Sequence, residues 1–560
     1  MSRMPLGLWV ASGLLCPIVL FGQSARGAVV VQLLAINDFH GALEPPEGAT
    51  GRINMVPAGG AEYLSTHLKN ALRENPNSVI VAAGDLIGAT PLTSALFHDE
   101  PAIETMNAIG LSVSAVGNHE FDHGWRALMR LQRGGCDPTD GCRDGDGFSG
   151  AKFQYLSANV VRKTNRALQP LFPATAIRSV GGVKIGFIGE TLRRTRQLVT
   201  PTGVRGLSFL DEWSVANRHA ARLKLQGINA IVLLIHEGGQ QNPGEPAPEP
   251  NGCANLTGAI VPIVQKLSPA IGVIVSAHTH QFYNCTIDGH TVTSAGSNGR
   301  MFTRVNLTID SSTDTITNVA ASNEVVTRDV EKDPAITRLL TKYSALSRST
   351  ANRVVGTASA EITARRNHAG ESALGDVIAD AQLAATSPAA KGGARVAFMN
   401  PGGIRADIVG NVRPDGSQVR DVTYAHLFTV QPFGNTLTVL TMTGEQIRQL
   451  LEQQFDSPNP GESRILQVSA GFSYRYALGA PAGQHVDPAS IQIAGRIVRP
   501  TDRVRVAANS FLVAGGDNFT IFEDIGNFNG GDIDVDALME YFRTHSPAAP
   551  GPQNRIVRTD

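Results

Sequence analysis

The chain has 560 residues, of which 42% are hydrophobic and 17% are charged. This is the profile of a globular protein long enough for two or more domains with full cores. The formal net charge is −1, from 48 basic and 49 acidic residues. Proteins that track the phosphates of DNA or RNA are usually basic, so this balance argues against a nucleic-acid polymer as partner. A small anionic substrate needs only a local basic patch.

The N-terminus has the pattern of an export signal. Arg3 supplies a positive start, Leu6–Leu20 is apolar, and small residues follow up to Ala28. We predict a signal peptide over residues 1–28, cleaved between Ser24 and Ala28, and a secreted, periplasmic or extracellular protein. The alternative is a membrane anchor, for which the apolar stretch is short. No later segment is long and apolar enough to span a bilayer, so no membrane span is expected after signal removal.

The first half of the chain alternates strand and helix patterns. Apolar, β-branched runs predict buried strands, and the apolar spacing of residues 60–72 predicts a helix. Gly181 and Gly182 separate two strand-like runs and favour a hairpin, so mixed rather than purely parallel sheets are expected. The predicted buried strands are Val29–Ile36, Ser78–Ala83, Leu111–Val116, Lys184–Ile188, Ala230–Ile235 and Ile271–Ser276.

Metal-ligand side chains come just after five of these strands. In α/β sheets, ligands bind at the C-terminal edge of the strands. Asp, Asn and His offer oxygen and nitrogen donors suited to a divalent metal. Seven such donors, one of them shared, can hold two metals side by side, an arrangement that cleaves phosphate esters. The seven candidate ligands are Asp38, His40, Asp85, Asn118, His236, His278 and His280.

The rest of the chain divides into a closing sheet, a connector and a second domain. Residues 298–324 read as alternating strands that close the first domain. The helical spacing of residues 333–349 predicts a connecting helix. A second domain begins at about Arg353, with a helix over residues 373–385 and a strand over residues 396–399.

Four of the five cysteines follow the export segment. Cys136 and Cys142 flank a turn-rich loop, and Cys253 and Cys285 flank one βα unit. An even count in an exported chain favours two disulfides. Three pairings are possible, and we prefer Cys136–Cys142 with Cys253–Cys285. Four free thiols are the alternative, and the spacing is wrong for a structural zinc site.

The ligand motifs resemble those of the calcineurin-like metallophosphoesterases, over roughly residues 29–330. The family pattern is D-x-H, GD, GNH[ED], a lone His and GH-x-H, and this chain departs from it only at Ala277, where the family usually has Gly. The resemblance implies that Asp38, His40 and His280 bind one metal and that Asn118, His236 and His278 bind the other. Asp85 would bridge them, and a shared water would be the nucleophile. Zn, Mn, Fe, Co and Mg all suit this donor set.

His119 and Asp122 form a second candidate pair. His119 adjoins a ligand and can face the substrate, and Asp122 can orient its imidazole, so the pair is expected to stabilise charge or protonate the leaving oxygen. The alternative for Asp122 is an N-cap of a helix over residues 125–131. Glu120 is expected to support the ligands. Four histidines belong to no motif and are expected at the surface: His98, His123, His219 and His290.

The second domain resembles the C-terminal domain of the 5′-nucleotidases. The resemblance rests on the segments 370–375, 400–405, 432–435 and 510–519. Phe433 and Phe511 would sandwich a flat base, with stacking worth ~1–3 kcal/mol per base. The other expected substrate residues are Asn400, Arg405, Asn435 and Asp517. Arg365 and Arg366 are both candidates for a further arginine of the family, because the family pattern fits either of these neighbouring positions.

These resemblances imply an α/β fold. An N-terminal metallophosphoesterase sandwich of mixed sheets flanked by helices is expected over residues 29–330, a helical linker over 331–352, and a C-terminal α+β substrate-binding domain over 353–560. The expected function is hydrolysis of nucleoside 5′-monophosphates to nucleoside and phosphate with two divalent metal ions. The alternatives are a UDP-sugar or 2′,3′-cyclic-nucleotide hydrolase, or a non-catalytic binding or adhesion protein. The oligomeric state stays open.

Overall fold

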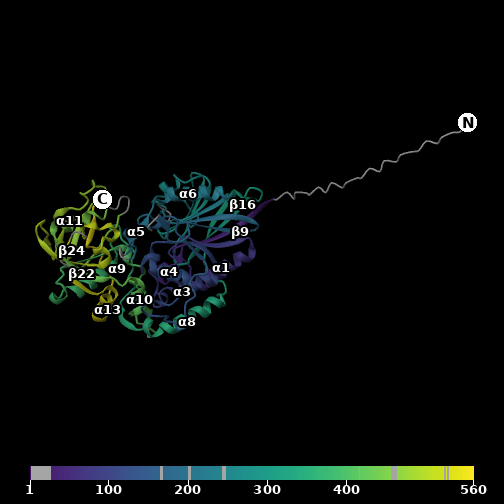
Figure 1. The fold of residues 1–560 in the computed structure, drawn as a ribbon. Coiled ribbons are helices and arrows are strands. Elements are labelled where there is room, and N and C mark those ends of the chain that lie inside the picture. The colour runs from purple at the N-terminus through teal and green to yellow at the C-terminus, as the bar shows by residue number, and fades with distance from the viewer. Residues whose placement is uncertain are drawn as a thin grey trace.

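The computed structural model describes residues 1, 27–163, 168–199, 203–242, 248–414, 417–455, 463–522, 525 and 529–560. Most of the predicted export signal, residues 2–26, lies outside this part of the chain. Within the described ranges, no helix combines the length and apolar character that a membrane span requires. Figure 1 shows two halves side by side, the first in purple to teal and the second in green to yellow.

The first half contains two six-stranded mixed sheets, as predicted from the sequence. In the first sheet the order is β17 (Thr315–Val325), β16 (Met301–Asp310), β1 (Ala28–Ile36), β4 (Ser78–Ala82), β5 (Leu111–Ala115) and β6 (Gln154–Leu156). In the second it is β14 (Phe282–Ile287), β15 (His290–Ala295), β13 (Ile271–Val275), β12 (Ala230–His236), β10 (Val183–Thr191) and β9 (Thr175–Val180). Strands β1, β4 and β5 are parallel neighbours, and so are β12 and β13. Five strand ends that carry candidate ligands therefore lie at two matching sheet edges.

The two sheets pack face to face, with helices on their outer faces. Leu33 of β1, Phe187 of β10 and Val232 of β12 are fully buried in one apolar cluster between the sheets. The clusters on the outer faces contain residues of the helices, so each sheet is covered on both sides. The helices of this half are α1 (Ala61–Glu74), α2 (Leu92–Ala95), α3 (Glu100–Ile109), α4 (Trp125–Arg133), α5 (Thr195–Leu198), α6 (Glu212–Leu225) and α7 (Ile260–Val264).

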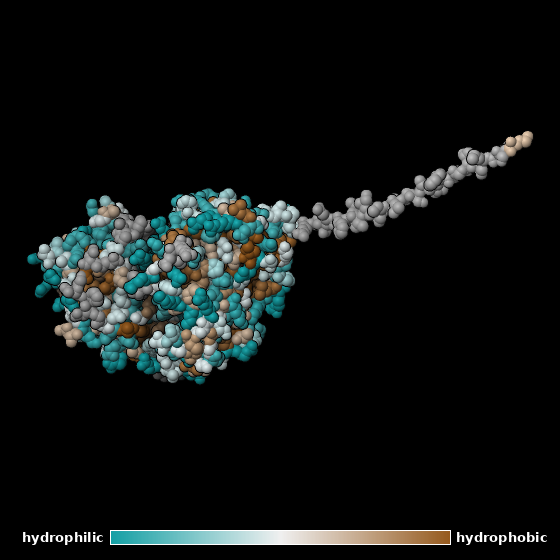
Figure 2. All heavy atoms as spheres, viewed as in Figure 1, coloured by the Kyte–Doolittle hydropathy of each residue, from teal (hydrophilic) through white to brown (hydrophobic). Residues whose placement is uncertain are grey.

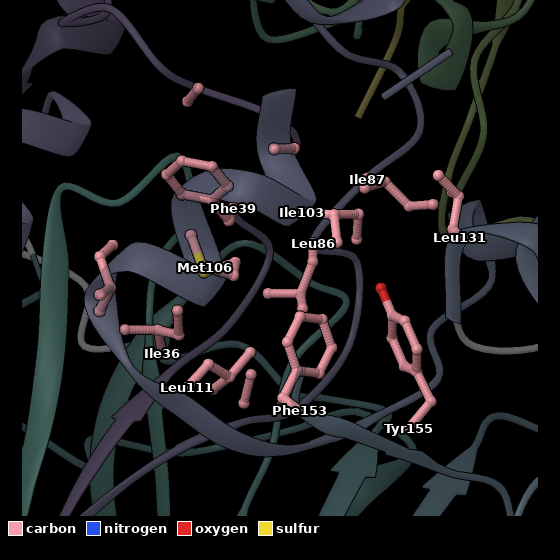
Figure 3. Close-up of a cluster of buried hydrophobic side chains, with 14 of the residues drawn as sticks. Ile36, Phe39, Leu86, Ile87, Ile103, Met106, Leu111, Leu131, Phe153 and Tyr155 are labelled. Carbon is pink, nitrogen blue, oxygen red and sulfur yellow. The ribbon is translucent and has the colours of Figure 1, made fainter. Parts of the chain in front are cut away.

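Apolar residues next to the candidate ligands anchor the ligand loops in the core. Phe39 stands between Asp38 and His40, and Leu86 follows Asp85; both apolar side chains are fully buried. Figure 3 shows them in one cluster with Met106 of α3. Because close-packed interiors hold side chains in fixed positions, these anchors fix the loops from which the ligands project.

Helix α8 (Pro334–Ala351) connects the halves, where the connecting helix is predicted. It packs against α1, α2 and α3 and also contacts α10 of the second half (Figure 1). Lys342 lies 2.8 Å from Asp144, and the Tyr343 hydroxyl donates to Glu104 at 2.9 Å. The connector is thus tied by side-chain contacts to the first half.

The second half combines smaller sheets with helices, the α+β arrangement expected. Its strands are β18 (Val354–Ala358), β19 (Val396–Met399), β20 (Asn411–Val412), β21 (Arg420–Thr423), β22 (Thr436–Thr443), β23 (Gln467–Val468), β24 (Phe472–Tyr476), β25 (Gln492–Ile493), β26 (Arg496–Ile497), β27 (Arg503–Asn509), β28 (Asn529–Ile533) and β29 (Ile556–Arg558). Its helices are α9 (Ala373–Thr386), α10 (Tyr424–Val430), α11 (Gly444–Glu452), α12 (Ser510–Val513) and α13 (Asp534–Thr544). In Figure 2 polar side chains cover most of the visible face of both halves, and apolar ones are scattered.

Both preferred disulfides are present, Cys136–Cys142 and Cys253–Cys285. The surface prediction for the motif-free histidines is wrong for two of them. His219 and His290 are buried, at 8% and 4% exposure. His219 lies on the face of α6 that also buries Val215 and Leu223, and His290 Nδ1 lies 2.7 Å from the carbonyl oxygen of Ile271.

Candidate metal centre and substrate cavity

Six of the seven candidate ligands form two compact groups. Asp38, His40 and His280 form one, and Asp85, His236 and His278 form the other. Within each group the ligand atoms lie within 4.8 Å of one another. The first group is the set that the family resemblance assigns to one metal. The second contains His236 and His278, which the resemblance assigns to the other metal, together with Asp85.

Asp85 of the second group also lies near the first group. Its Oδ2 is 3.7 Å from His40 Nε2 in the first group and 2.9 Å from His236 Nε2 in the second. Its other oxygen, Oδ1, accepts a hydrogen bond from the backbone N–H of His119 at 2.9 Å. One carboxylate oxygen is therefore held by the backbone, and the other lies near an imidazole of each group.

Five of the seven candidate ligands have a left-handed backbone. Only a few per cent of non-glycine residues adopt positive φ, and such residues cluster at functional sites. The five, with φ between 48° and 72°, are Asp38, His40, Asp85, His278 and His280. All five belong to the two groups of ligands.

Two glycines allow the ligand loops to approach one another. A Cβ on Gly84 would lie 2.6 Å from the backbone nitrogen of Gly117 and 2.9 Å from His236 Nδ1. A Cβ on Gly117 would collide with Asp85 Oδ1. The glycines of the GD and GNH[ED] motifs are thus required by close contact at the centre itself. Ala277, at the position where the motif departs from the family, is buried in the core between the sheets.

The imidazoles are oriented for metal binding. His40 Nδ1 lies 2.9 Å from the carbonyl oxygen of Gly88, and His236 Nδ1 lies 2.9 Å from that of Ala83. A carbonyl at Nδ1 fixes the tautomer and leaves the Nε2 lone pair for a metal. Burial lowers the pKa of His40 to about 3, and it also lowers the pKa values of His278 and His280. These rings are therefore neutral, the form that binds a cation.

The pKa of His236 reflects the negative charge of the neighbouring carboxylates. Burial lowers its pKa, but the charges of Asp85 and Asp38 outweigh burial and raise the pKa to about 10. The two carboxylates thus favour a positive charge at this point. Three buried atoms here, Asp85 Oδ2, Asn118 Oδ1 and His236 Nε2, make no aligned hydrogen bond within the described residues. Unsatisfied buried donors and acceptors are costly, and a divalent cation fits both the charge and the orphaned atoms.

His119 and Asp122 form the expected pair. Their Nδ1 and Oδ2 atoms lie 2.8 Å apart. The helix that follows, α4, has Gly124 at its N-cap, so the cap alternative for Asp122 is wrong. Burial lowers the pKa of His119, but Asp122 and Asp85 outweigh burial and raise it. Glu120 accepts from the backbone N–H groups of Asp85, Leu86 and Gly117 at 2.6–2.9 Å, as expected of a supporting residue.

A cavity of about 280 Å³ joins the two halves at this centre. From the first half it is lined by Asn118, His119, Asp122 and His278, among others. From the second half it is lined by Asn400, Arg405, Phe433, Asn435, Phe511 and Asp517. Arg366 also lines the cavity and Arg365 does not, which favours Arg366 of the two alternatives. Arg405 Nη2 reaches to 3.5 Å from His40 Nε2, so a second-half side chain touches a candidate ligand.

Arg464 is a cavity residue that the sequence reasoning missed. It lines the cavity, and its Nη1 donates to Asp517 Oδ1 at 2.5 Å. Together with Arg366 and Arg405 it brings three guanidinium groups to one small space. Guanidinium groups bind phosphate and carboxylate through paired N–H donors, so the cavity is suited to an anion.

A third group of possible ligands lies outside the cavity. His98 lies near Asp137 and Asp140, which belong to the loop closed by the Cys136–Cys142 disulfide. Arg143 Nη2 already lies 2.7 Å from Asp140 Oδ2. Arg143 thus supplies a positive charge beside these carboxylates.

Two family models match the chain. Residues 31–282 match the calcineurin-like phosphoesterase model. Residues 354–524 match the 5′-nucleotidase C-terminal domain. The first match covers every candidate metal ligand, and the second covers every second-half residue named above as lining the cavity.

The chain is similar to known proteins along nearly its whole length. The chain is 31% identical over 538 residues to endonuclease YhcR of Bacillus subtilis, covering 94% of this chain and 41% of that protein. It is 30% identical over 566 residues to cell wall protein Lmo0130 of Listeria monocytogenes, covering 94% of this chain and 68% of that protein. A crystal structure of a 5′-nucleotidase precursor from Thermus thermophilus superposes with a TM-score of 0.78 and 25% identity, covering 95% of this chain and all of that one.

The fold and the site define a metal-dependent phosphoester hydrolase. The chain belongs to the 5′-nucleotidase family, which joins a calcineurin-like phosphoesterase domain to a 5′-nucleotidase C-terminal domain.

Proposed function

We propose that the protein is an exported 5′-nucleotidase that binds two divalent metals and converts nucleoside 5′-monophosphates to nucleoside and phosphate. The observation that carries the proposal is the shared cavity. It brings the His119–Asp122 pair and the metal-ligand groups of the first half against the arginines and phenylalanines of the second. The residue roles and the domain boundaries 29–330, 331–352 and 353–560 are part of this proposal.

The two groups of ligands would hold one metal each, with Asn118 completing the second group and Asp85 shared. When bound, the metals supply an activated water and neutralise charge on the phosphate. Asp85 accepts a hydrogen bond through Oδ1 from the backbone N–H of His119, and this contact would keep the shared carboxylate in a fixed position between the two sites. Arg405, whose Nη2 lies 3.5 Å from His40 Nε2, would bind a phosphate oxygen beside the centre.

His119 would assist departure of the nucleoside. Its Nδ1 is engaged by Asp122, which leaves Nε2 for the substrate. The raised pKa of His119 keeps a proton available near neutral pH. Donation from Nε2 to the leaving 5′-oxygen avoids the release of an alkoxide, and Asp122 stabilises the imidazolium before that transfer.

The second half would recognise the nucleoside. The cavity of about 280 Å³ is close to the lower end of small-ligand pockets, and its aromatic and amide side chains match a base and a sugar. Phe511 offers a stacking face, Asp517 a hydroxyl acceptor, and Asn435 polar edges. A UDP-sugar or cyclic nucleotide would use the same groups, so these hydrolases are the closest alternatives.

The similarity to an endonuclease raises a nucleic-acid polymer as a further substrate. This chain spans only 41% of that protein, and its net charge of −1 lacks the basic excess of polymer-tracking proteins. A mononucleotide is therefore favoured. Export is supported by the two disulfides and by the cell wall protein among the similar sequences. A non-catalytic binding or adhesion protein is disfavoured because all seven candidate ligand positions carry donor side chains.

A substrate panel tests the proposal. Substrate consumption and the products formed are measured by chromatography for 5′-AMP, UDP-glucose, 2′,3′-cyclic AMP, a single-stranded oligonucleotide and p-nitrophenyl phosphate, with Mn²⁺ or Zn²⁺ present. The highest kcat/KM is expected for 5′-AMP. A preference for the oligonucleotide, or equal use of p-nitrophenyl phosphate and 5′-AMP, would contradict it.

A further inference from the structure

Asn509 joins two parts of the cavity wall. It is the last residue of β27 and is fully buried. Its Oδ1 accepts from the backbone N–H of Leu512 at 2.9 Å and so caps α12, the short helix that carries Phe511. Its Nδ2 donates to Asn400 Oδ1 at 2.9 Å. One buried amide thus contacts both the helix of an aromatic cavity residue and the loop of Asn400.

The contact continues from Asn400 to Asp517. Asn400 Nδ2 donates to Asp517 Oδ2 at 3.0 Å, and Arg464 Nη1 donates to the other carboxylate oxygen at 2.5 Å. Asp517 is only 7% exposed and has a left-handed backbone, with φ of 54°. A carboxylate oxygen can accept more than one hydrogen bond, and Asp517 lines the cavity, so a ligand hydroxyl there can donate to it.

The direction of this chain of hydrogen bonds is fixed at both ends. The backbone N–H of Leu512 can only donate, so Asn509 must present its oxygen there and its nitrogen to Asn400. The Asp517 carboxylate can only accept, so Asn400 must present its nitrogen to Asp517. Both ends demand the same orientation of the two amides, which removes the usual ambiguity of amide assignment.

The fold places the two asparagines side by side. Strands β19 and β27 are parallel neighbours, with Phe398 opposite Ala508. Asn400 follows the end of β19, and Asn509 ends β27. The contact therefore arises at the C-terminal edge of a parallel strand pair, where α/β folds build binding sites.

We propose that Asn509 is a positioning residue for the nucleoside. Through Asn400 it orients Asp517 to accept hydrogen bonds from the ribose hydroxyls, and through its cap it fixes the helix that presents Phe511. The proposal rests on the nucleotidase function proposed above. Asn509 does not line the cavity, and by this proposal it couples recognition of the sugar to stacking of the base.

Two substitutions separate the two roles of Asn509. Asn509→Asp keeps the size and an oxygen for Leu512 but has no N–H for Asn400. Asn400 can then satisfy the new carboxylate only by turning its amide, which points its oxygen at Asp517. Asn509→Ser keeps a capping hydroxyl without adding charge, and it is too short to reach Asn400. Thr443→Ala is the matched control, because it removes the N-cap of α11 in the same half, away from the cavity lining.

The measurement is the ratio of kcat/KM for 5′-AMP to that for 2′,3′-dideoxy-AMP, at pH 8 with Mn²⁺ present. A site built to bind a hydroxyl rejects an analogue that lacks it, so wild type is expected to prefer AMP by about tenfold or more. Both Asn509 variants are expected to lower this ratio at least about fivefold, and Thr443→Ala is expected to keep it. A general loss of folded protein would lower both rates equally and leave the ratio unchanged.

Each contrary outcome has a distinct meaning. If wild type discriminates and both Asn509 variants retain the full ratio, the positioning role is overturned. If wild type uses AMP far better than p-nitrophenyl phosphate but does not distinguish AMP from dideoxy-AMP, the nucleotidase function stands and the ribose role of Asp517 falls, and with it this inference. If AMP is no better than p-nitrophenyl phosphate, the nucleotidase function itself fails.

Discussion

The ring of Phe433 stacks on the imidazole of His119, with centroids 5.7 Å apart and planes 23° apart. Phe433 belongs to the second half and His119 to the first, so this contact crosses between them beside the metal centre. The guanidinium carbon of Arg405 also lies over the Phe433 ring, 5.9 Å from its centroid. Phe433 is therefore a neighbour of the proposed proton donor as well as a candidate face for the base.

The two phenylalanines are expected to respond differently to truncation. Phe511→Ala should lower kcat/KM for 5′-AMP by an amount equivalent to ~1–3 kcal/mol of transition-state stabilisation, because it removes a ring on which the base would stack. With p-nitrophenyl phosphate, which has no base, its loss should be much smaller. Phe433→Ala should lower kcat/KM for both substrates, because it also frees the His119 ring. Steady-state kinetics with both substrates distinguish these outcomes, and an equal loss in Phe511→Ala would mean that this ring only packs the fold.

Loss of the His119 side chain tests proton donation. His119→Ala should lower kcat for 5′-AMP by ~10²–10⁴, the usual contribution of a general acid, while bound metal stays near the wild-type amount. Metal analysis of the purified variant provides the control. Loss of metal together with activity would make His119 a ligand or a structural residue.

Asp122 should set the pH at which His119 loses its proton. Burial lowers the pKa of His119, and the charges of Asp122 and Asp85 raise it above the ordinary value. Asp122→Asn removes one of these charges, so the pKa of His119 should fall. Activity that needs the protonated ring declines as pH rises through that pKa, so the basic limb of the kcat/KM profile should move to lower pH. An unmoved limb would assign it to another group.

Much of the candidate metal centre could be predicted because its sequence signal is local. Asp38, Asp85 and His278 each follow an apolar strand, and the chain order of strands and helices brings such strand ends to one edge. The strand and helix limits agree closely for the same reason. Residues 333–349 are predicted as a helix, for example, and α8 spans Pro334–Ala351.

Arg464 and Asn509 were not predicted from the sequence, because their hydrogen-bond partners are far away along the chain. Arg464 meets Asp517 across 53 positions, and Asn509 meets Asn400 across 109, so no local pattern marks either one. His219 was predictable in part, because the apolar residues Val215 and Leu223 lie at four-residue spacings on either side of it. That spacing places it on the buried face of α6.

Asp534 should make stability depend on pH. Burial raises its pKa from 3.8 to about 7, although hydrogen bonds with Asn435 partly offset the shift. When folding raises the pKa of a carboxyl, the protein is most stable below about pH 4, where the group is protonated in both the folded and the unfolded state. The free energy of unfolding then falls as the pH rises towards 7, because the unfolded state ionises first. Asp534→Asn should remove this decline.

The measurement is the melting temperature at pH 5 and pH 8, at constant metal concentration. The matched control is Asp536→Asn, which removes a charge from the same first turn of α13 at an exposed position. The difference between the two pH values should shrink in Asp534→Asn only. Equal behaviour of the two variants would show that the effect comes from the helix terminus and not from burial.

Gly117 should be essential to metal binding for a steric reason. A methyl group at this position would collide with Asp85 Oδ1 and push the shared carboxylate out of place. Gly117→Ala should weaken metal binding by at least the ~10–100-fold typical of residues that support ligands. Gly551→Ala, where a Cβ meets nothing within 4 Å, is the control. Metal content after dialysis is the readout, and full retention would argue against Asp85 as the shared ligand.

The central claim is that metals held at Asp85 and its neighbours act on a nucleotide held by the second half. The most direct test is phosphate release from 5′-AMP by one preparation before chelation, after chelation and after a divalent metal is added back. We expect activity to disappear with the metal and to return with it, and Asp85→Asn to stay inactive throughout. Undiminished hydrolysis of 5′-AMP by metal-free protein, or full activity in Asp85→Asn, would contradict the claim.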